Sequence, residues 1–348
     1  MSDHDRGDRL PPVAVTLGEP SGVGPDIVLA IHAGRHRDLP DFFVLADPRM
    51  LADRAARLAI PLTLHAIAAP QEAAAAPAGA LAVLPLVNRQ VETPGRIDPD
   101  NAAATVEAID RGTAFVLAGE ASALVTGPID KKALYDFGFR HPGHTEYLAD
   151  LCEKRLGRPF TPVMLLTGPD LSCVPVTIHI PLAEVPRQLT AELIETTCRI
   201  VDADYRSRLG IAAPRLAISG LNPHAGEKGA IGTEEETVIR PAIERLRAAG
   251  IDAFGPMPAD TMFHAEARRG YDVAICMYHD QALIPAKTLA FDQTVNATLG
   301  LPIVRTSPDH GTAADIAGTG RARPDSFLAA LRLAARMAAG AGGSAPRI

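Results

Sequence analysis

Short apolar runs alternate with longer stretches of helical periodicity along almost the whole chain. Such runs are typical of strands that are buried on both faces. Strands alternating with helices predict an α/β fold with a largely parallel sheet covered by helices. The expected strands are residues 13–17, 42–46, 81–87, 123–126, 162–166, 172–178, 215–219, 272–277 and 295–299.

Polar residues mark where several helices are expected to begin. Asp47 has the character of an N-cap, with Pro48 at the first helical position. Thr190 is a second expected N-cap, and residues 233–236 (TEEE) have the spacing of a capping box. A long helical pattern covers residues 102–118, whereas residues 68–80, rich in alanine and proline, predict a surface loop or irregular helix without evident chemistry.

Composition limits the classes of function. The chain has 348 residues, enough for two α/β lobes, and its net charge of −7 gives no reason to expect nucleic acid as a partner. No apolar run approaches the ~20 residues of a spanning helix, so no membrane partner is expected. The N-terminus (MSDHDRGDRL) lacks the apolar core of a secretory signal. Four scattered cysteines without CxxC spacing favour buried, reduced thiols and a cytoplasmic location.

Three histidines occupy the same kind of position, at or just past the end of an expected strand. They are His179, His224 and His279. In parallel sheets, ligands bind beyond the carboxyl ends of the strands. A single histidine there is usually an ordinary loop residue, but three of them favour a catalytic transition-metal site with an open position. Residues 280 and 281, an acid and an amide, are candidate partners for the imidazole of His279.

Several loops have the composition of anion or nucleotide sites. Residues 18–24 (GEPSGVG) join a strand to a helix and can present backbone N–H groups to an anion, although such a turn needs glycine in any case. Lys131 and Lys132 follow another strand and are either anion ligands or a solvated basic turn. His144 and Thr145 begin a helix, where Thr145 is either a cap or a ligand. Residues 306–320, rich in small and hydrogen-bonding residues, suit a nucleotide.

Lys287 lies two helical turns after His279, on nearly the same face if residues 280–287 are helical. A lysine beside a metal site makes sense when an anionic substrate lies between the two cations. Asn296 and Arg305 bracket further strand-like runs and can complete an anion pocket, because arginine recognises carboxylates and phosphates in a bidentate manner.

Nine motifs in order closely resemble the 4-hydroxythreonine-4-phosphate dehydrogenase family of vitamin B6 biosynthesis. The resemblance runs from about residue 13 to about residue 337. The motifs are 18–25 (GEPSGVGP), 126–131 (TGPIDK), 143–146 (GHTE), 177–179 (TIH), 221–227 (LNPHAGE), 259–261 (ADT), 277–281 (MYHDQ), 296–302 (NATLGLP) and 305–312 (RTSPDHGT).

The resemblance implies a two-lobed fold of the isocitrate/isopropylmalate dehydrogenase type, with a cleft between the lobes. We expect a discontinuous first lobe of residues 1–137 and 305–348, and a second lobe of residues 138–304 with the metal ligands and the dimer interface. The resemblance also implies a homodimer whose active site lies at the subunit interface.

The resemblance further assigns roles to individual residues. It implies that His179, His224 and His279 bind one divalent cation per subunit, with ligands drawn from both subunits; zinc, magnesium, cobalt and manganese all remain open. It places five residues at the substrate: His144, Thr145, Lys287, Asn296 and Arg305. Lys287 is the candidate catalytic residue, either holding the substrate anion or assisting proton transfer. Adenosine contacts with NAD or NADP are expected from Asp309, His310, Gly311, Thr312, Asp315 and Gly318.

The implied reaction is oxidation of the secondary alcohol of 4-phosphooxy-L-threonine to 2-amino-3-oxo-4-(phosphooxy)butanoate. This product loses carbon dioxide to give 3-amino-2-oxopropyl phosphate. One alternative keeps the chemistry and changes the substrate to a four-carbon phosphorylated sugar acid such as 4-phosphoerythronate or 4-phosphothreonate. Another is a phosphate acyltransferase of similar fold, and a third is a binding protein without catalytic activity.

Overall fold

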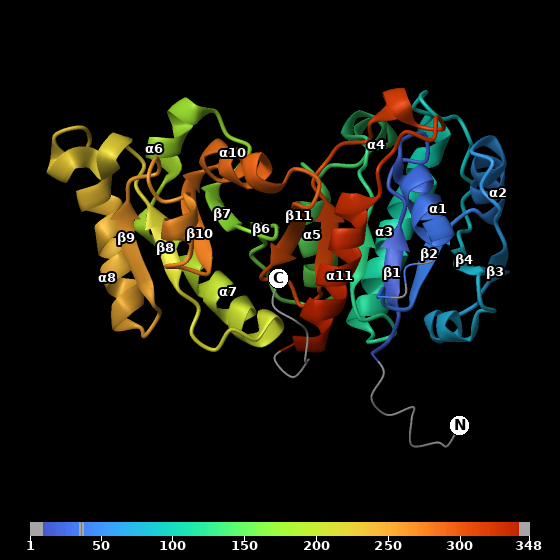
Figure 1. The fold of residues 1–348 in the computed structure, drawn as a ribbon, viewed down its shortest axis with the longest axis horizontal. Coiled ribbons are helices and arrows are strands. Elements are labelled where there is room, and N and C mark those ends of the chain that lie inside the picture. The colour runs from blue at the N-terminus through green and yellow to red at the C-terminus, as the bar shows by residue number, and fades with distance from the viewer. Residues whose placement is uncertain (1–9, 35, 37, 341–348) are drawn as a thin grey trace, which may run out of the picture. The chain divides into compact units, whose positions relative to one another are not determined.

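The computed structural model describes residues 10–34, 36 and 38–340, and it divides into two compact units (Figure 1). The first unit comprises Met1–Thr161 and Leu301–Ala338, and the second comprises Pro162–Gly300 and Ala339–Ile348. Residues 138–161, which we expected in the second lobe, therefore pack with the first unit. Most of the polar N-terminal segment lies outside the described residues.

The first unit contains a sheet with the strand order β3-β4-β2-β1-β5-β12, in which every pairing is parallel. β1 is buried at all four of its positions, as expected for a strand that is covered on both faces. The elements are β1 (Val13–Thr16), α1 (Gly24–Gly34), β2 (Phe42–Ala46), α2 (Pro48–Arg57), β3 (Leu64–Ala66), β4 (Leu81–Pro85), α3 (Ala102–Leu117), β5 (Leu124–Thr126), α4 (Lys131–Phe137), α5 (His144–Leu156), β12 (Arg305–Pro308) and α11 (Asp325–Ala339).

The second unit has the strand order β11-β6-β7-β10-β8-β9. Pairing is parallel from β7 to β9, whereas β6 runs antiparallel to both of its neighbours. The elements are β6 (Val163–Thr167), β7 (Ser172–Thr177), α6 (Val185–Gln188), α7 (Ala191–Leu209), β8 (Leu216–Ser219), α8 (Arg240–Ala248), β9 (Ala253–Met257), α9 (Ala265–Arg268), β10 (Val273–Tyr278), α10 (His279–Ala290) and β11 (Val295–Leu299).

The nine expected strands are all present, with ends that shift by one or two residues. Asp47 and Thr190 cap their helices as predicted, through hydrogen bonds to Arg49 N and Leu193 N. The short strands β9 and β12 were not expected, and β12 takes the first residues of a segment that we had interpreted as loop. Residues 70–75 form a short 3-10 helix, in line with the irregular structure expected there.

The capping box predicted at residues 233–236 was wrong. The Thr233 side chain caps no backbone N–H; it is the backbone oxygen of Thr233 that accepts a bond, from the Thr237 hydroxyl. The carboxylate of Glu235 turns inward and is fully buried. It accepts hydrogen bonds from the loop after β8. The other member of the predicted box, Glu236, accepts from Arg240 instead of from the backbone N–H of Thr233.

All four cysteines are buried and free, as expected. Burial raises the pKa of the Cys152 thiol to about 11, so little reactive thiolate forms near neutral pH. No helix among the described residues is long and apolar enough to cross a membrane.

A fully buried guanidinium, that of Arg54, anchors the loop between β1 and α1. It donates to the carbonyl oxygens of Pro20 (2.8 Å) and Gly22 (3.2 Å). It also forms ion pairs with Asp26 and, at 2.8 Å, with Glu92. The second carboxylate oxygen of Asp26 accepts from the backbone N–H of Gly318 at 2.7 Å. One buried cation therefore joins the glycine-rich loop to the segment where we expect the nucleotide.

We predict that Arg54→Met lowers the free energy of unfolding by about 3–5 kcal/mol, because it leaves Asp26 buried without its cation. Arg57→Met is the matched control. Arg57 pairs with the same Glu92, but its side chain is 49% exposed, so the loss should stay within about 1 kcal/mol. Urea unfolding of the two variants and the wild type measures the difference, and equal losses would contradict the assigned role of Arg54.

Candidate active site

The three candidate metal ligands follow the carboxyl ends of neighbouring strands in the second unit. His179 follows β7, His279 follows β10 as the first residue of α10, and His224 lies in the turn after β8. The strands β7, β10 and β8 are direct neighbours and run parallel. Their carboxyl ends therefore meet at the same edge, where ligands bind in open α/β sheets.

Side-chain hydrogen bonds tie these strand ends together. The Thr177 hydroxyl donates to the carbonyl oxygen of Met277 at 2.7 Å, which joins β7 to β10. The buried amide of Gln281 accepts from Met277 N at 2.6 Å and from the Ser219 hydroxyl at 2.8 Å. Its nitrogen donates to Gly220 O at 2.8 Å, which joins β10 to β8. The backbone that carries each histidine is thus fixed relative to the other two strand ends.

The imidazoles of His179 and His279 lie side by side, with ring centroids 5.6 Å apart and planes inclined by 44°. The Asp280 carboxylate accepts a hydrogen bond of 2.7 Å from Nδ1 of His279. Because a carboxylate accepts, Nδ1 carries the proton and Nε2 keeps its lone pair, as in many metal-binding histidines. Both rings line a cavity of about 230 Å³ together with Thr177, Ile180, Leu182, Val185, Tyr278 and Asp280.

His224 does not join the other two histidines within a single chain. Among the described residues, no group of three or more His, Cys, Asp or Glu side chains could hold a metal ion. The donor chemistry of the two adjacent imidazoles fits a transition metal, but the set of three is incomplete in one copy of the chain.

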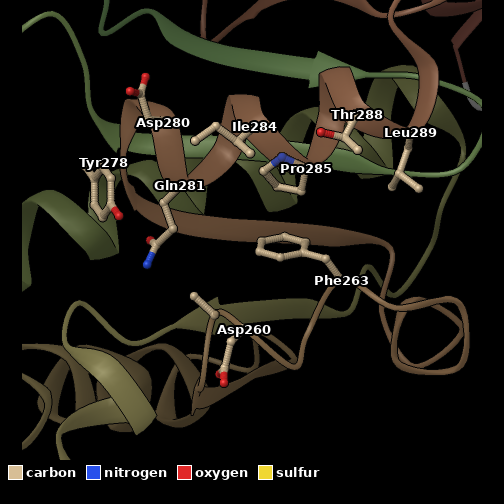
Figure 2. A pocket seen from close by; sticks show the side chains of 10 residues that line it. Asp260, Phe263, Tyr278, Asp280, Gln281, Ile284, Pro285, Thr288 and Leu289 are labelled. Atoms are coloured by element: carbon tan, nitrogen blue, oxygen red, sulfur yellow. The ribbon is translucent and has the colours of Figure 1, made fainter.

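A larger cavity of about 490 Å³ lies against α10 and shares Tyr278 and Asp280 with the histidine cavity. Figure 2 shows its lining, which includes Ile284, Pro285 and Leu289 of α10 and the ring of Phe263. This cavity is mainly apolar, so it suits a hydrocarbon surface better than a phosphate.

The side chains of Arg305, His144 and Lys131 interact electrostatically in the first unit. Arg305 is 4% exposed and donates to the Thr126 hydroxyl at 2.7 and 3.2 Å. Burial lowers the pKa of Arg305 to about 10. Nε2 of His144 is buried without a hydrogen-bond partner, and burial, together with the charges of Arg305 and Lys131, holds the pKa of His144 well below 6.5. A neutral imidazole near two cations is suited to donate a hydrogen bond to an anion.

The remaining candidate substrate residues divide between the two units. Thr145 lies in the first turn of α5, but Gly143 occupies the N-cap position and no side chain caps this helix, so the capping alternative for Thr145 was wrong. Lys287 and Asn296 belong to the second unit. Lys287 lies on α10, which is helical as expected, with Nζ 5.8 Å from the ring centroid of Phe291. Oδ1 of Asn296 is buried without a hydrogen-bond partner.

The expected nucleotide segment wraps around the glycine-rich loop. The carbonyl oxygen of Thr312 accepts from Val23 N at 2.9 Å, and the backbone N–H of Gly318 donates to Asp26. A Cβ at Gly22 would lie 2.7 Å from Thr312 O, so only glycine permits this close approach. Asp309, His310 and Gly311 lead into this segment, and Asp315 lies exposed in a 3-10 turn.

Two buried charged residues near these loops were not singled out from the sequence. Arg54 lies on the same helical face as Met50 and Leu51, and Glu235 lies four residues before the buried Ile239. In both cases a charged residue interrupts an apolar face. This spacing was the available signal, because a charged residue on a buried face needs a partner.

Comparisons with known proteins agree with these features. The family model described as pyridoxal phosphate biosynthetic protein PdxA matches residues 38–334. The chain belongs to this family. A relative from Bradyrhizobium diazoefficiens, named 4-hydroxythreonine-4-phosphate dehydrogenase, is 55% identical over 337 residues, covering 94% of this chain and 97% of the relative.

Two solved structures resemble the chain over nearly its full length. A 4-hydroxythreonine-4-phosphate dehydrogenase from Klebsiella pneumoniae is 38% identical with a TM-score of 0.84, covering 94% of this chain and 99% of that one. A terephthalate 1,2-cis-dihydrodiol dehydrogenase from Burkholderia xenovorans is 27% identical with a TM-score of 0.63, covering 94% and 98%. The expected α/β fold class and family are therefore confirmed.

The lowered pKa of His144 predicts a dependence of stability on pH. The unfolded chain binds a proton at this residue near pH 6.5, whereas the folded chain binds it only at lower pH. Stability therefore falls as pH decreases below about 6.5. Between pH 7.5 and 5.5 we expect His144→Asn to remove roughly 1 kcal/mol of this loss. His65→Asn, on β3, is the control and should keep the wild-type slope in urea unfolding at both pH values.

Proposed function

We propose that this member of the PdxA family is a metal-dependent, NAD(P)-linked dehydrogenase that oxidises 4-phosphooxy-L-threonine in pyridoxal 5′-phosphate biosynthesis. The near-full-length identity of 55% to a relative named for this activity carries the proposal. The adjacent imidazoles of His179 and His279 support it, because they supply two nitrogen ligands at the edge of the sheet where substrates bind.

His179, His224 and His279 would together hold the divalent cation. One chain brings only two of these rings together, so the set requires ligands from both subunits of a homodimer. The bound cation would supply Lewis-acid polarisation of the substrate alcohol, and the nicotinamide would supply the oxidant. Zinc, cobalt, manganese and magnesium remain the candidate ions.

The anionic ends of the substrate match the cationic groups of the chain. Arg305 and neutral His144 would bind a phosphate or carboxylate, with Thr145 as a further donor. Asn296 has a buried oxygen to accept from a substrate donor such as an amine or hydroxyl. The segment that includes Asp309, Thr312 and Gly318 would contact the adenosine part of NAD or NADP.

A bound nicotinamide would accept the hydride from the carbon of the alcohol, and the hydroxyl proton would be released. Lys287 is the proposed residue to accept this proton or to hold the substrate anion. The resulting ketone lies β to the carboxylate, so loss of carbon dioxide gives 3-amino-2-oxopropyl phosphate. Because this is a biosynthetic step, we propose a cytoplasmic location.

An alternative substrate class needs a direct test. The relative from Burkholderia xenovorans is named for a cis-dihydrodiol, which carries neither phosphate nor amine. Four-carbon phosphorylated sugar acids lack only the amine. Terephthalate cis-dihydrodiol also carries anionic carboxylates, so the buried Arg305 favours an anionic substrate without separating these classes. Near-full-length identity to named dehydrogenases leaves little support for an acyltransferase.

An assay of NAD and NADP reduction with 4-phosphooxy-L-threonine tests the proposed function. We expect turnover that EDTA abolishes and that added Co²⁺, Mn²⁺ or Zn²⁺ restores. A panel with 4-phosphoerythronate, 4-phosphothreonate and a cis-dihydrodiol should give lower kcat/KM values. Undiminished activity in EDTA would refute the metal dependence, and a preferred panel substrate would replace the proposed one.

The apolar surface of α10 supports the proposed homodimer. Ile284, Leu289 and Phe291 are large apolar residues that are 64%, 38% and 67% exposed. Such a patch is costly in a monomer. We expect Ile284→Asp to shift the dimer toward monomer in sedimentation velocity, whereas Val87→Asp, at an 88% exposed position in the first unit, should not. A monomeric wild type would contradict the homodimer.

A further inference from the structure

The turn that carries His224 has an unusual backbone. Residues 224–228 all adopt left-handed conformations, with φ between 42° and 74°. Only Gly226 among them lacks a Cβ, so the other four residues adopt a conformation that is disfavoured for L-amino acids. A disfavoured backbone persists only where its surroundings hold it in place.

One buried carboxylate, that of Glu235, holds the start of this turn. Glu235 is 0% exposed. Its Oε1 accepts hydrogen bonds from Leu221 N at 2.8 Å and from Asn222 N at 2.7 Å. Its Oε2 accepts from the side-chain amide of Asn222 at 3.0 Å. Three donors immediately before His224 therefore converge on one side chain.

The turn also closes tightly around Glu235. A Cβ at Gly226 would lie 2.5 Å from Oε2, and a Cβ at Gly220 would lie 3.1 Å from Oε1. A Cβ at Gly232 would lie 2.3 Å from the amide nitrogen of Asn222. These glycines let the backbone approach the carboxylate, so the shape of the turn depends on Glu235.

We propose that Glu235 is a positioning residue for the metal site. It holds the left-handed turn, and with it the backbone of His224, in the arrangement that metal binding requires. This inference rests on the proposed function, in which His224 is a ligand. Glu235 itself does not contact the metal or the substrate in this role.

The neighbouring residues provide matched controls. Glu236 is exposed and pairs with Arg240 on the surface at 3.0 Å, so Glu236→Gln changes the same charge without touching the turn. Glu235→Gln is nearly isosteric, but it places an NH₂ group opposite a donor and leaves one of the three N–H groups without an acceptor. Gly226→Ala keeps Glu235 and strains the same turn from the opposite side.

Titration of the metal-free full chain with Co²⁺, followed by visible absorption, tests the inference without turnover. We expect Glu235→Gln and Gly226→Ala to weaken Co²⁺ binding on the order of 10- to 100-fold. At saturation, their ligand-field bands should differ from those of the wild type. Glu236→Gln should match the wild type, and circular dichroism and gel filtration show whether each variant folds.

His224→Ala separates the two levels of the hypothesis. If this variant binds Co²⁺ as the wild type does, His224 is not a ligand and the proposed metal site fails. If His224→Ala loses affinity while folded Glu235→Gln and Gly226→Ala keep wild-type affinity and spectra, the positioning role is overturned and the metal site stands. Should Glu235→Gln not fold, Gly226→Ala alone decides.

Discussion

Parallel pairing of β7, β10 and β8 is the constraint on which the candidate metal site depends. It brings three histidines that lie 45 and 55 residues apart in sequence to one edge of one sheet. Thr177 and Gln281 then fix the strand ends by hydrogen bonds to backbone groups. The strands therefore fix the positions of the three candidate ligands, while the short segments after the strands supply the reactive side chains.

Buried charged side chains fix the positions of the loops, as strand pairing fixes the positions of the histidines. Arg54 joins the glycine-rich loop to the segment proposed to bind the nucleotide in the first unit, and Glu235 holds the turn of His224 in the second. In both units a single charged side chain satisfies several backbone groups that no helix or strand can pair. Loops of irregular shape need such partners, because unpaired buried N–H and C=O groups are costly.

The sequence predicted the strands well because burial on both faces leaves uninterrupted apolar runs, as in β1 and β8. It predicted the edge position of His179, His224 and His279 because strand ends could be located. It did not predict how Glu235 would be used, since three consecutive glutamates look alike and only packing decides which one turns inward. The Thr233 capping box failed because Glu236 pairs with Arg240 instead of with the backbone of Thr233. The local sequence pattern also could not predict the antiparallel pairing of β6, because strand direction depends on which strands become its neighbours.

The division of the first unit between the two ends of the chain has a consequence for biogenesis. β12 pairs with β5, although the whole stretch Pro162–Gly300 of the second unit separates these two strands in sequence. During translation, the strands of that contiguous stretch emerge from the ribosome before β12 is synthesised. The first unit therefore lacks β12 until nearly all of the polypeptide has been made. Until then β5 has an unpaired edge, which is a site of aggregation that chaperones can shield.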